Sequence, residues 1–302
     1  MAEVFSGGEE IPNADRLQPT DQARKKRRLV TNMHREERLD NWRNSRKSGL
    51  FCDLLEKETI DKVRSLEWLR RGVLKYDGER IIIAAQDQGL NTKGLQKVMG
   101  LVTNDRCRFC KSAVESTTHL LSGCQILLSE ERYTVRHNKV CRVVHWRICK
   151  HYGIPVSSLS WKHEPPSIIE NEQIKITYDK CIPVARHITN NAVRPDIVVI
   201  DKSTNSALII DVSVPSDFGI CRQEREKIVK YQDLKNDMKE TYNLTSIEIV
   251  PVIIGATGVL KKNFIKYLQM IPGDIKPLEL QLEVLRESVS ILKRALGCSL
   301  LE

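Results

Sequence analysis

Three features that would identify common classes of protein are scarce or missing in this 302-residue sequence. Aromatic residues make up only 5% of it, so a hydrophobic core must be built mainly from aliphatic side chains. No stretch of 18 uninterrupted apolar residues occurs, and the most apolar stretch, residues 249–260, contains glycines. The first ten residues lack the basic and apolar regions of a secretory signal peptide. We therefore expect a globular protein with no membrane partner.

Nine cysteines are present in this chain without a secretory signal. Disulfides persist mainly in oxidising compartments, so we expect free thiols and an intracellular protein. Cysteines at short spacings in such a chain are more typical of metal binding than of a disulfide framework.

Positive charge is in excess, because 48 Lys and Arg against 39 Asp and Glu give a net charge of +9. This excess favours a polyanionic partner such as nucleic acid. The basic run at residues 24–28 is typical of a nuclear localisation signal or of an arm that contacts phosphates. A solvated charge run on a disordered tail would look the same. We expect a nuclear protein.

The pattern of apolar residues divides the chain into four parts. Helix-like spacing begins near residue 54, a polar cysteine-bearing segment follows, and β-branched runs begin beyond the prolines at 165 and 166. The predicted parts are a basic and disordered arm (1–53), a helical linker (54–104), a zinc knuckle with a basic helix that Ser129 begins (105–152) and an α/β domain (160–302).

The last part is expected to hold a mixed sheet flanked by helices. Its strand-like and helix-like segments alternate along the chain. The predicted strands are 173–178, 196–201, 207–214 and 247–254, and the predicted helices are 217–242, 260–270 and 278–296.

The cysteine-bearing segment has the spacing C-x2-C-x8-H-x4-C, formed by Cys107, Cys110, His119 and Cys124. A tetrahedral zinc ion needs four thiolate or imidazole ligands that converge on one point, and C-x2-C aims two thiolates at it. Four protein ligands close the coordination shell, so we expect a structural zinc site. Chance spacing among nine cysteines is the alternative.

The helix after this segment is strongly basic. Arg136, His137, Asn138 and Arg142 are candidates for contacts with nucleic acid, and small zinc knuckles often touch single strands. The alternative is that the knuckle only braces two helices against each other.

Two carboxylates are expected to meet on neighbouring strands. Asp196 precedes a β-branched run, and Asp211 stands inside the next one, which a short turn connects to the first. A carboxylate inside a buried strand is costly unless something pairs with it. Two of them side by side suit Mg²⁺ or Mn²⁺, which can activate water for phosphodiester cleavage.

The helix after the second strand offers two lysines near this site. Lys227 and Lys230 could position the attacking water or offset charge, and Arg194, next to Pro195-Asp196, could contact phosphate. Taken singly, Asp196 could be only a turn residue and the lysines only part of a solvated helix face. Together these residues have the layout of a PD-(D/E)xK nuclease, except that Ser213 stands where the motif has its lysine.

The order of these motifs resembles the C-terminal region of one group of non-long-terminal-repeat retrotransposon proteins. These proteins encode a restriction-like endonuclease and insert at fixed sites such as ribosomal DNA. The resemblance covers roughly residues 55–270. It includes a stretch at residues 84–88 that is similar to the helical linker before the knuckle.

The resemblance implies a restriction-endonuclease-like core with Asp196 and Asp211 as Mg²⁺ ligands and with Lys227 or Lys230 as the catalytic lysine. It implies that the protein nicks duplex target DNA and that its partners include element RNA and a separately supplied reverse transcriptase. No adjacent Asp-Asp pair occurs, so reverse transcriptase activity is not expected. The alternative is a domesticated or degenerate protein that binds nucleic acid through zinc and basic residues without cleaving it.

Overall fold

The computed structural model describes residues 19–44, 49–182 and 193–297. The part before the sheet is helical, with elements α1 (Pro19–Arg43), α2 (Gly49–Leu55), α3 (Lys62–Ser65), α4 (Glu67–Arg70), α5 (Tyr76–Gln86), α6 (Lys93–Val98), α7 (Thr117–Ser122), α8 (Gln125–Ser129), α9 (Arg132–His151) and the 3₁₀ turn η1 (Ser160–Lys162). The remaining elements are β1 (Ile168–Glu170), β2 (Ile174–Tyr178), β3 (Ile197–Asp201), β4 (Ser206–Ser213), η2 (Asp217–Gly219), α10 (Ile220–Lys230), α11 (Gln232–Thr241), β5 (Ser246–Ile253), α12 (Phe264–Met270) and α13 (Pro277–Leu296).

The five strands form one mixed sheet in the order β1-β2-β3-β4-β5. Strands β1 to β4 pair antiparallel, and β3 and β4 form the predicted hairpin with Ile197 opposite Ile210. Strand β5 is parallel to β4 because α10 and α11 carry the chain back to the other end of the sheet. The two carboxylates of the hairpin therefore lie at the same end of β3 and β4.

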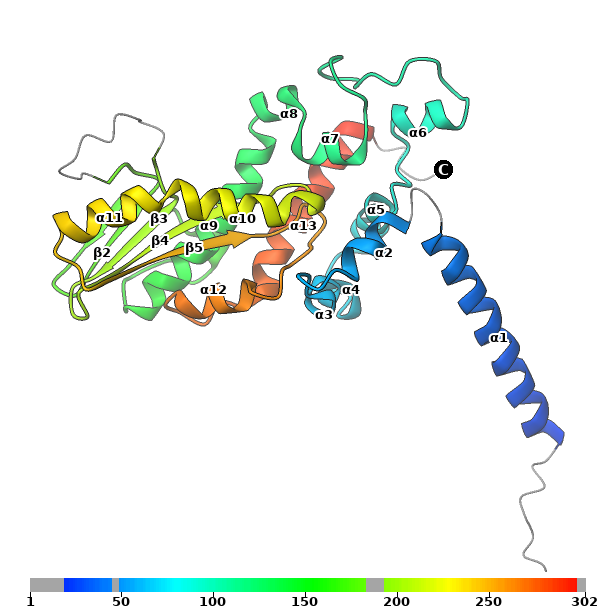
Figure 1. Cartoon of the computed structure of the whole chain (residues 1–302), viewed down its shortest axis with the longest axis horizontal. Coiled ribbons are helices and arrows are strands. Elements are labelled where there is room, and N and C mark those ends of the chain that lie inside the picture. The colour runs from blue at the N-terminus through cyan, green and yellow to red at the C-terminus, as the bar shows by residue number, and fades with distance from the viewer. Residues whose placement is uncertain (1–18, 45–48, 183–192, 298–302) are drawn as a thin grey trace, which may run out of the picture.

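Helices cover both faces of the sheet (Figure 1). On one face, α9, α12 and α13 bury aliphatic side chains against residues such as Ile176, Val199 and Val252. On the other face, Tyr231, which lies between α10 and α11, joins Leu234 and Met238 of α11 in a second apolar cluster. The expected α/β domain with a mixed sheet flanked by helices is confirmed at this level.

The C-terminal helix α13 joins the parts of the chain to each other. It packs against α9, α5, α7 and α4. One apolar cluster contains Ile81 of α5, Leu120 of α7 and Ile291 of α13, together with the sulfur-bearing Cys107 and Cys124. The cysteine-bearing segment, although polar in sequence, therefore shares a core with the linker and with α13.

Two local expectations from the sequence are wrong. Residues 19–43 of the arm form the exposed helix α1, which extends away from the rest of the molecule (Figure 1), because this stretch is rich in strong helix formers. The basic run at residues 24–28 lies on this helix, while residues 1–18 lie outside the described part. In the second case, α9 begins at Arg132 after Glu131 in the left-handed region (φ 58°), so Ser129 does not cap it.

No helix in the described ranges is both long enough and apolar enough to cross a membrane.

Candidate functional site

The four predicted zinc ligands lie together. The ligand atoms of Cys107, Cys110, His119 and Cys124 are all within 4.8 Å of one another. The sulfurs of Cys107 and Cys124 are 3.8 Å apart, and the Cys110 sulfur is 3.3 Å from His119 Nε2. Ligands on one tetrahedral zinc are about 3.8 Å apart for two sulfurs and about 3.6 Å for sulfur and nitrogen. The geometry fits a metal ion such as zinc.

A short hairpin and a buried ion pair hold the first two ligands in place. Cys107 donates its backbone N–H to Ala113 at 2.8 Å, and the reversal at Lys111 has a φ of 57°. The fully buried Glu115 accepts from the Arg108 backbone and pairs with its guanidinium at 2.7 Å. Burial acts to raise the pKa of Glu115, but these hydrogen bonds outweigh it and lower the pKa. The carboxylate therefore remains charged and keeps the hairpin closed.

The thiols of the cluster differ in how readily they ionise. The Ser112 hydroxyl donates to the Cys110 sulfur at 3.2 Å and lowers the pKa of Cys110 to about 6. Burial raises the pKa of Cys107 to about 11. A thiolate is the form that binds metal, so Cys110 is ready for metal at neutral pH, while Cys107 needs a cation to favour its ionised form.

Helix α9 fastens this cluster to the sheet through Tyr133 and Arg136. The Tyr133 hydroxyl donates to Leu120 O at 2.8 Å. The guanidinium of Arg136 donates to Leu121 O, to Val214 O at the end of β4 and to Ser288 Oγ on α13. Arg136 is 1% exposed, so the expectation that it contacts nucleic acid is wrong. Its position among buried acceptors shows that it braces the fold.

The predicted acidic site forms where β3, β4 and α10 meet. Asp211 is 2% exposed, and its Oδ2 lies 2.7 Å from the ammonium nitrogen of Lys227. Tyr231 donates its hydroxyl to Asp211 Oδ1. Burial and the neighbouring charge of Asp196 raise the pKa of Asp211, while Lys227 and Tyr231 act in the opposite direction. The structure thus places both predicted carboxylates and one of the predicted lysines at one site.

Asp196 has two partners of its own. Its Oδ2 accepts from the Val212 backbone N–H at 2.6 Å and from His137 Nε2 at 3.1 Å. Burial acts to lower the pKa of His137, but the hydrogen bond to Asp196 outweighs it and raises the pKa. The second residue of the predicted nucleic-acid group, His137, is therefore a charged partner of Asp196.

The other predicted residues lie around this centre without touching either carboxylate. Lys230 is exposed and donates to the Tyr231 hydroxyl at 3.1 Å, and Arg194 pairs with Asp179 at 2.5 Å. Asn138 is exposed beside His137, with its Oδ1 3.0 Å from the ring, and Arg142 donates to Trp161 O at 3.1 Å. Arg194, Lys230 and Asn138 remain open to solvent.

Sequence reasoning missed two kinds of residue near these sites. Tyr231 contacts the buried Asp211, and a tyrosine that follows a lysine on a helix gives no signal of that contact. His137, Cys141, His145 and Cys149 are spaced four residues apart on α9, so they share one helix face. This spacing could have revealed two further groups that could hold a metal ion, namely His137 with Cys141 and Asp196, and His145 with Cys149 and His163.

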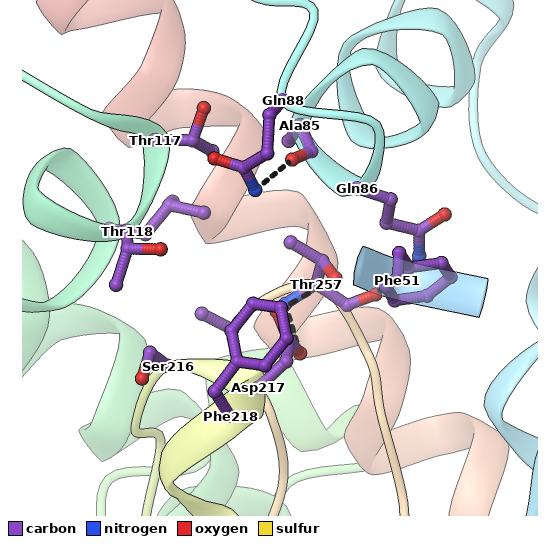
Figure 2. A pocket seen from close by; sticks show the side chains of 12 residues that line it. Phe51, Ala85, Gln86, Gln88, Thr117, Thr118, Ser216, Asp217, Phe218 and Thr257 are labelled. Carbon is purple, nitrogen blue, oxygen red and sulfur yellow. Dashed lines mark hydrogen bonds between the residues drawn. The ribbon is translucent and has the colours of Figure 1, made fainter. Parts of the chain in front are cut away.

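A small pocket lies at the junction of the linker, the knuckle and the sheet (Figure 2). Phe51, Thr117 and Phe218 line it, and the buried Asp217 accepts hydrogen bonds there from the backbone and hydroxyl of Thr257. A Cβ on Gly255 would lie 2.2 Å from Asp217 Oδ1, so this position requires glycine. None of the predicted site residues lines this pocket, and it is a packing junction.

No protein-family model matches the chain. No curated protein matches it either.

Proposed function

We propose that the protein is a metal-dependent DNA endonuclease of the restriction-like type, which nicks target DNA by attack of water on a phosphodiester. The observation that supports this most is the meeting of Asp196, Asp211 and Lys227 at the end of a β-hairpin. Two carboxylates and a lysine on two strands and the following helix are the groups that such a nuclease uses. The order of helix, antiparallel strands, helix and parallel strand is compatible with that fold.

The residues at this centre suit a divalent cation. Asp196 accepts a hydrogen bond from the backbone of Val212, the residue after Asp211, and the charge of Asp196 helps to raise the pKa of the buried Asp211. Asp211 Oδ2 makes no hydrogen bond of good geometry among the described residues, although Lys227 lies near it. Asp196 and Asp211 would hold Mg²⁺ or Mn²⁺, which would supply an activated water and stabilise charge on the phosphate.

The geometry favours Lys227 over Lys230 as the catalytic lysine. The Lys227 ammonium pairs with Asp211, whereas the Lys230 ammonium is exposed and lies over the Tyr231 ring. Lys227 can therefore hold a water or a phosphate oxygen beside the carboxylates. Lys230, Arg194 and Asn138 lie where they could contact the DNA backbone.

The test is nicking of supercoiled plasmid in Mg²⁺ and in Mn²⁺. We expect Asp211→Ala to reduce the nicking rate at least about 100-fold, as removal of a group that stabilises charge in the transition state does. Asp233→Ala is the matched control, because Asp233 is exposed on α11. Equal nicking by wild type and Asp211→Ala would overturn the proposal.

One observation favours a second candidate, a zinc-dependent nucleic-acid-binding protein that does not cleave. The protonated His137 already neutralises Asp196, so it competes with a metal ion for that carboxylate. Under this second proposal the protein binds duplex DNA with an affinity that falls steeply as the salt concentration rises. It leaves supercoiled plasmid intact in both Mg²⁺ and Mn²⁺. The same plasmid assay, combined with a DNA-binding titration, separates the two proposals.

A further inference from the structure

The C-terminal half of α9 carries a second cluster of metal-binding side chains that is separate from the knuckle and from the acidic centre. His145 and Cys149 lie one helical turn apart on α9, and His163 follows η1 in the segment that leads to β1. His145 and Cys149 are both 0% exposed and His163 is 5% exposed. Their nearest ligand atoms all lie within 4.8 Å of one another.

The distances in this cluster are close to those around a bound ion. The Cys149 sulfur is 3.5 Å from His145 Nδ1, near the separation of about 3.6 Å expected for sulfur and nitrogen on one zinc ion. His145 Nδ1 and His163 Nε2 are 2.8 Å apart, about half an ångström closer than two nitrogens on one zinc ion. His163 is the most exposed of the three side chains, so its ring is the one that would shift outward to admit an ion.

The cluster also contains a polar atom whose partner is missing. His145 Nε2 is buried and has no hydrogen-bond partner in the described part of the chain. Both short contacts inside the cluster use the other ring nitrogen, His145 Nδ1, which lies 2.8 Å from His163 Nε2 and 3.5 Å from the Cys149 sulfur. A metal ion held by the three side chains would therefore bind His145 through Nδ1, and it would not supply a partner for Nε2.

The donors suit a soft cation. Both histidines are buried, and a neutral imidazole nitrogen is the form that binds metals. On binding, the Cys149 thiol releases its proton, and the hydrogen-bonding proton of the histidine pair moves to the other nitrogen of its ring. One thiolate and two imidazoles are donors that both Zn²⁺ and Cu⁺ accept.

We propose that His145, Cys149 and His163 form a buried site for a d¹⁰ metal ion, Zn²⁺ or Cu⁺, which ties the segment before β1 to helix α9. The site is independent of the proposed nuclease activity. The ion cross-links residues that are up to 18 positions apart. It therefore holds η1 and the start of the sheet against the helix that also carries Arg136 and His137.

The competing account is a neutral histidine pair in the core that holds no metal. In that account one ring donates to the other across 2.8 Å, and Cys149 is a small apolar side chain. The two accounts differ in how many metal ions the folded protein contains.

The experiment counts metal ions per chain by native mass spectrometry together with elemental analysis. Protein is produced once with zinc and once with added copper under reducing conditions, which distinguishes the two ions. We expect Cys149→Ser and His163→Gln each to contain one metal ion fewer than wild type. The Gln side chain keeps a hydrogen-bonding group for His145, so loss of a hydrogen bond alone does not account for that result.

Two further variants serve as controls for the number of metal ions per chain. Cys221→Ser is the matched control, because Cys221 is half-buried and belongs to none of the metal-binding groups, and it should keep the wild-type metal content. Cys110→Ser removes a knuckle ligand, so this variant should lose the knuckle ion. The double variant with His163→Gln should therefore contain two metal ions fewer than wild type. Retention of the knuckle ion in His163→Gln shows that this variant is folded. Metal content equal to wild type in both Cys149→Ser and His163→Gln, with either metal, would overturn the proposal.

Discussion

The knuckle and the acidic centre are built in opposite ways. The four knuckle ligands come from 18 consecutive residues, and within the described ranges no lysine or arginine is paired with their sulfurs. The acidic centre takes its side chains from α9, β3, β4 and α10, and each of its carboxylates contacts a cationic group of the protein. A metal ion bound at the knuckle would balance the charge of its thiolates, whereas Lys227 and His137 already balance charge at the acidic centre.

This difference bears on whether each centre can fold without a bound metal ion. A site whose charge is balanced by Lys227 and His137 can fold without metal and then exchange ions with solvent. A cluster of thiols that shares a core with α5 and α13 would lose packing around it if a bound metal ion were removed. We therefore expect removal of metal to affect the knuckle more than the acidic centre. Three substitutions test how the knuckle, the paired carboxylate Asp211 and the unpaired carboxylate Asp217 are each stabilised.

The largest effect is expected from Cys124→Ser. Cys124 is fully buried in the cluster shared with Leu120 and Ile291, so the variant loses its knuckle ion and part of that core. Binding of structural zinc is worth about 10–16 kcal/mol in isolated fingers, so residues 105–130 should unfold locally. Hydrogen exchange should show loss of protection there, while β3 and β4 keep theirs. Cys181→Ser, at an exposed position, should leave exchange unchanged.

An intermediate effect is expected from Lys227→Met. This change leaves the buried Asp211 charge without its cation, and breaking such a pair costs about 3–5 kcal/mol. Chemical denaturation should show this loss, and adding Asp211→Asn to the same chain should restore most of it. Lys230→Met, at an exposed position three residues away, should change the free energy of unfolding by less than about 0.5 kcal/mol. Equal losses for the two lysines would show that Asp211 does not depend on Lys227.

The smallest effect on stability is expected at Asp217. The backbone N–H and hydroxyl of Thr257, and not a cation, donate hydrogen bonds to this buried carboxylate. Burial raises the pKa of Asp217 above its usual 3.8, and the hydrogen bonds from Thr257 only partly oppose this. Between pH 3.8 and the raised value, the folded state binds more protons than the unfolded state, so stability falls as pH rises.

Asp217→Asn removes this titration. Between pH 4 and pH 7, the free energy of unfolding should depend less on pH in the variant than in wild type, because the variant lacks the carboxyl whose pKa burial raises. The test at Asp217 complements the test at Lys227. It measures how much a buried carboxylate that is not paired with a cation lowers the free energy of unfolding when it ionises. An identical slope in wild type and Asp217→Asn would contradict the expected shift.

The sequence predicted the local parts of the molecule well. Each strand from β2 to β5 was predicted, because a β-branched run between turn residues marks a strand with little help from distant contacts. Strand β1 was missed, since three residues at the edge of a sheet carry too short a pattern. The four knuckle ligands were identified together because they are close in sequence as well as in space.

The parts that depend on tertiary packing could not be predicted. The sequence showed that Arg136 is basic and lies on a basic helix, but its burial is determined by α13, more than 150 residues further along the chain. Which of the two lysines, Lys227 or Lys230, pairs with Asp211 depends on which face of α10 meets β4. The pairing of His137 with Asp196, across 59 residues, has no local signature.

Helix α13 has a consequence for how the chain acquires this structure during synthesis. The ribosome delivers the knuckle about 170 residues before it delivers the end of α13, and at about 5–20 residues per second this gap lasts on the order of ten seconds or more. During that interval the apolar surfaces of α5 and α7 lack their later partner. A zinc ion that bound the knuckle as it emerged would order this segment first, and α13 would complete its core afterwards.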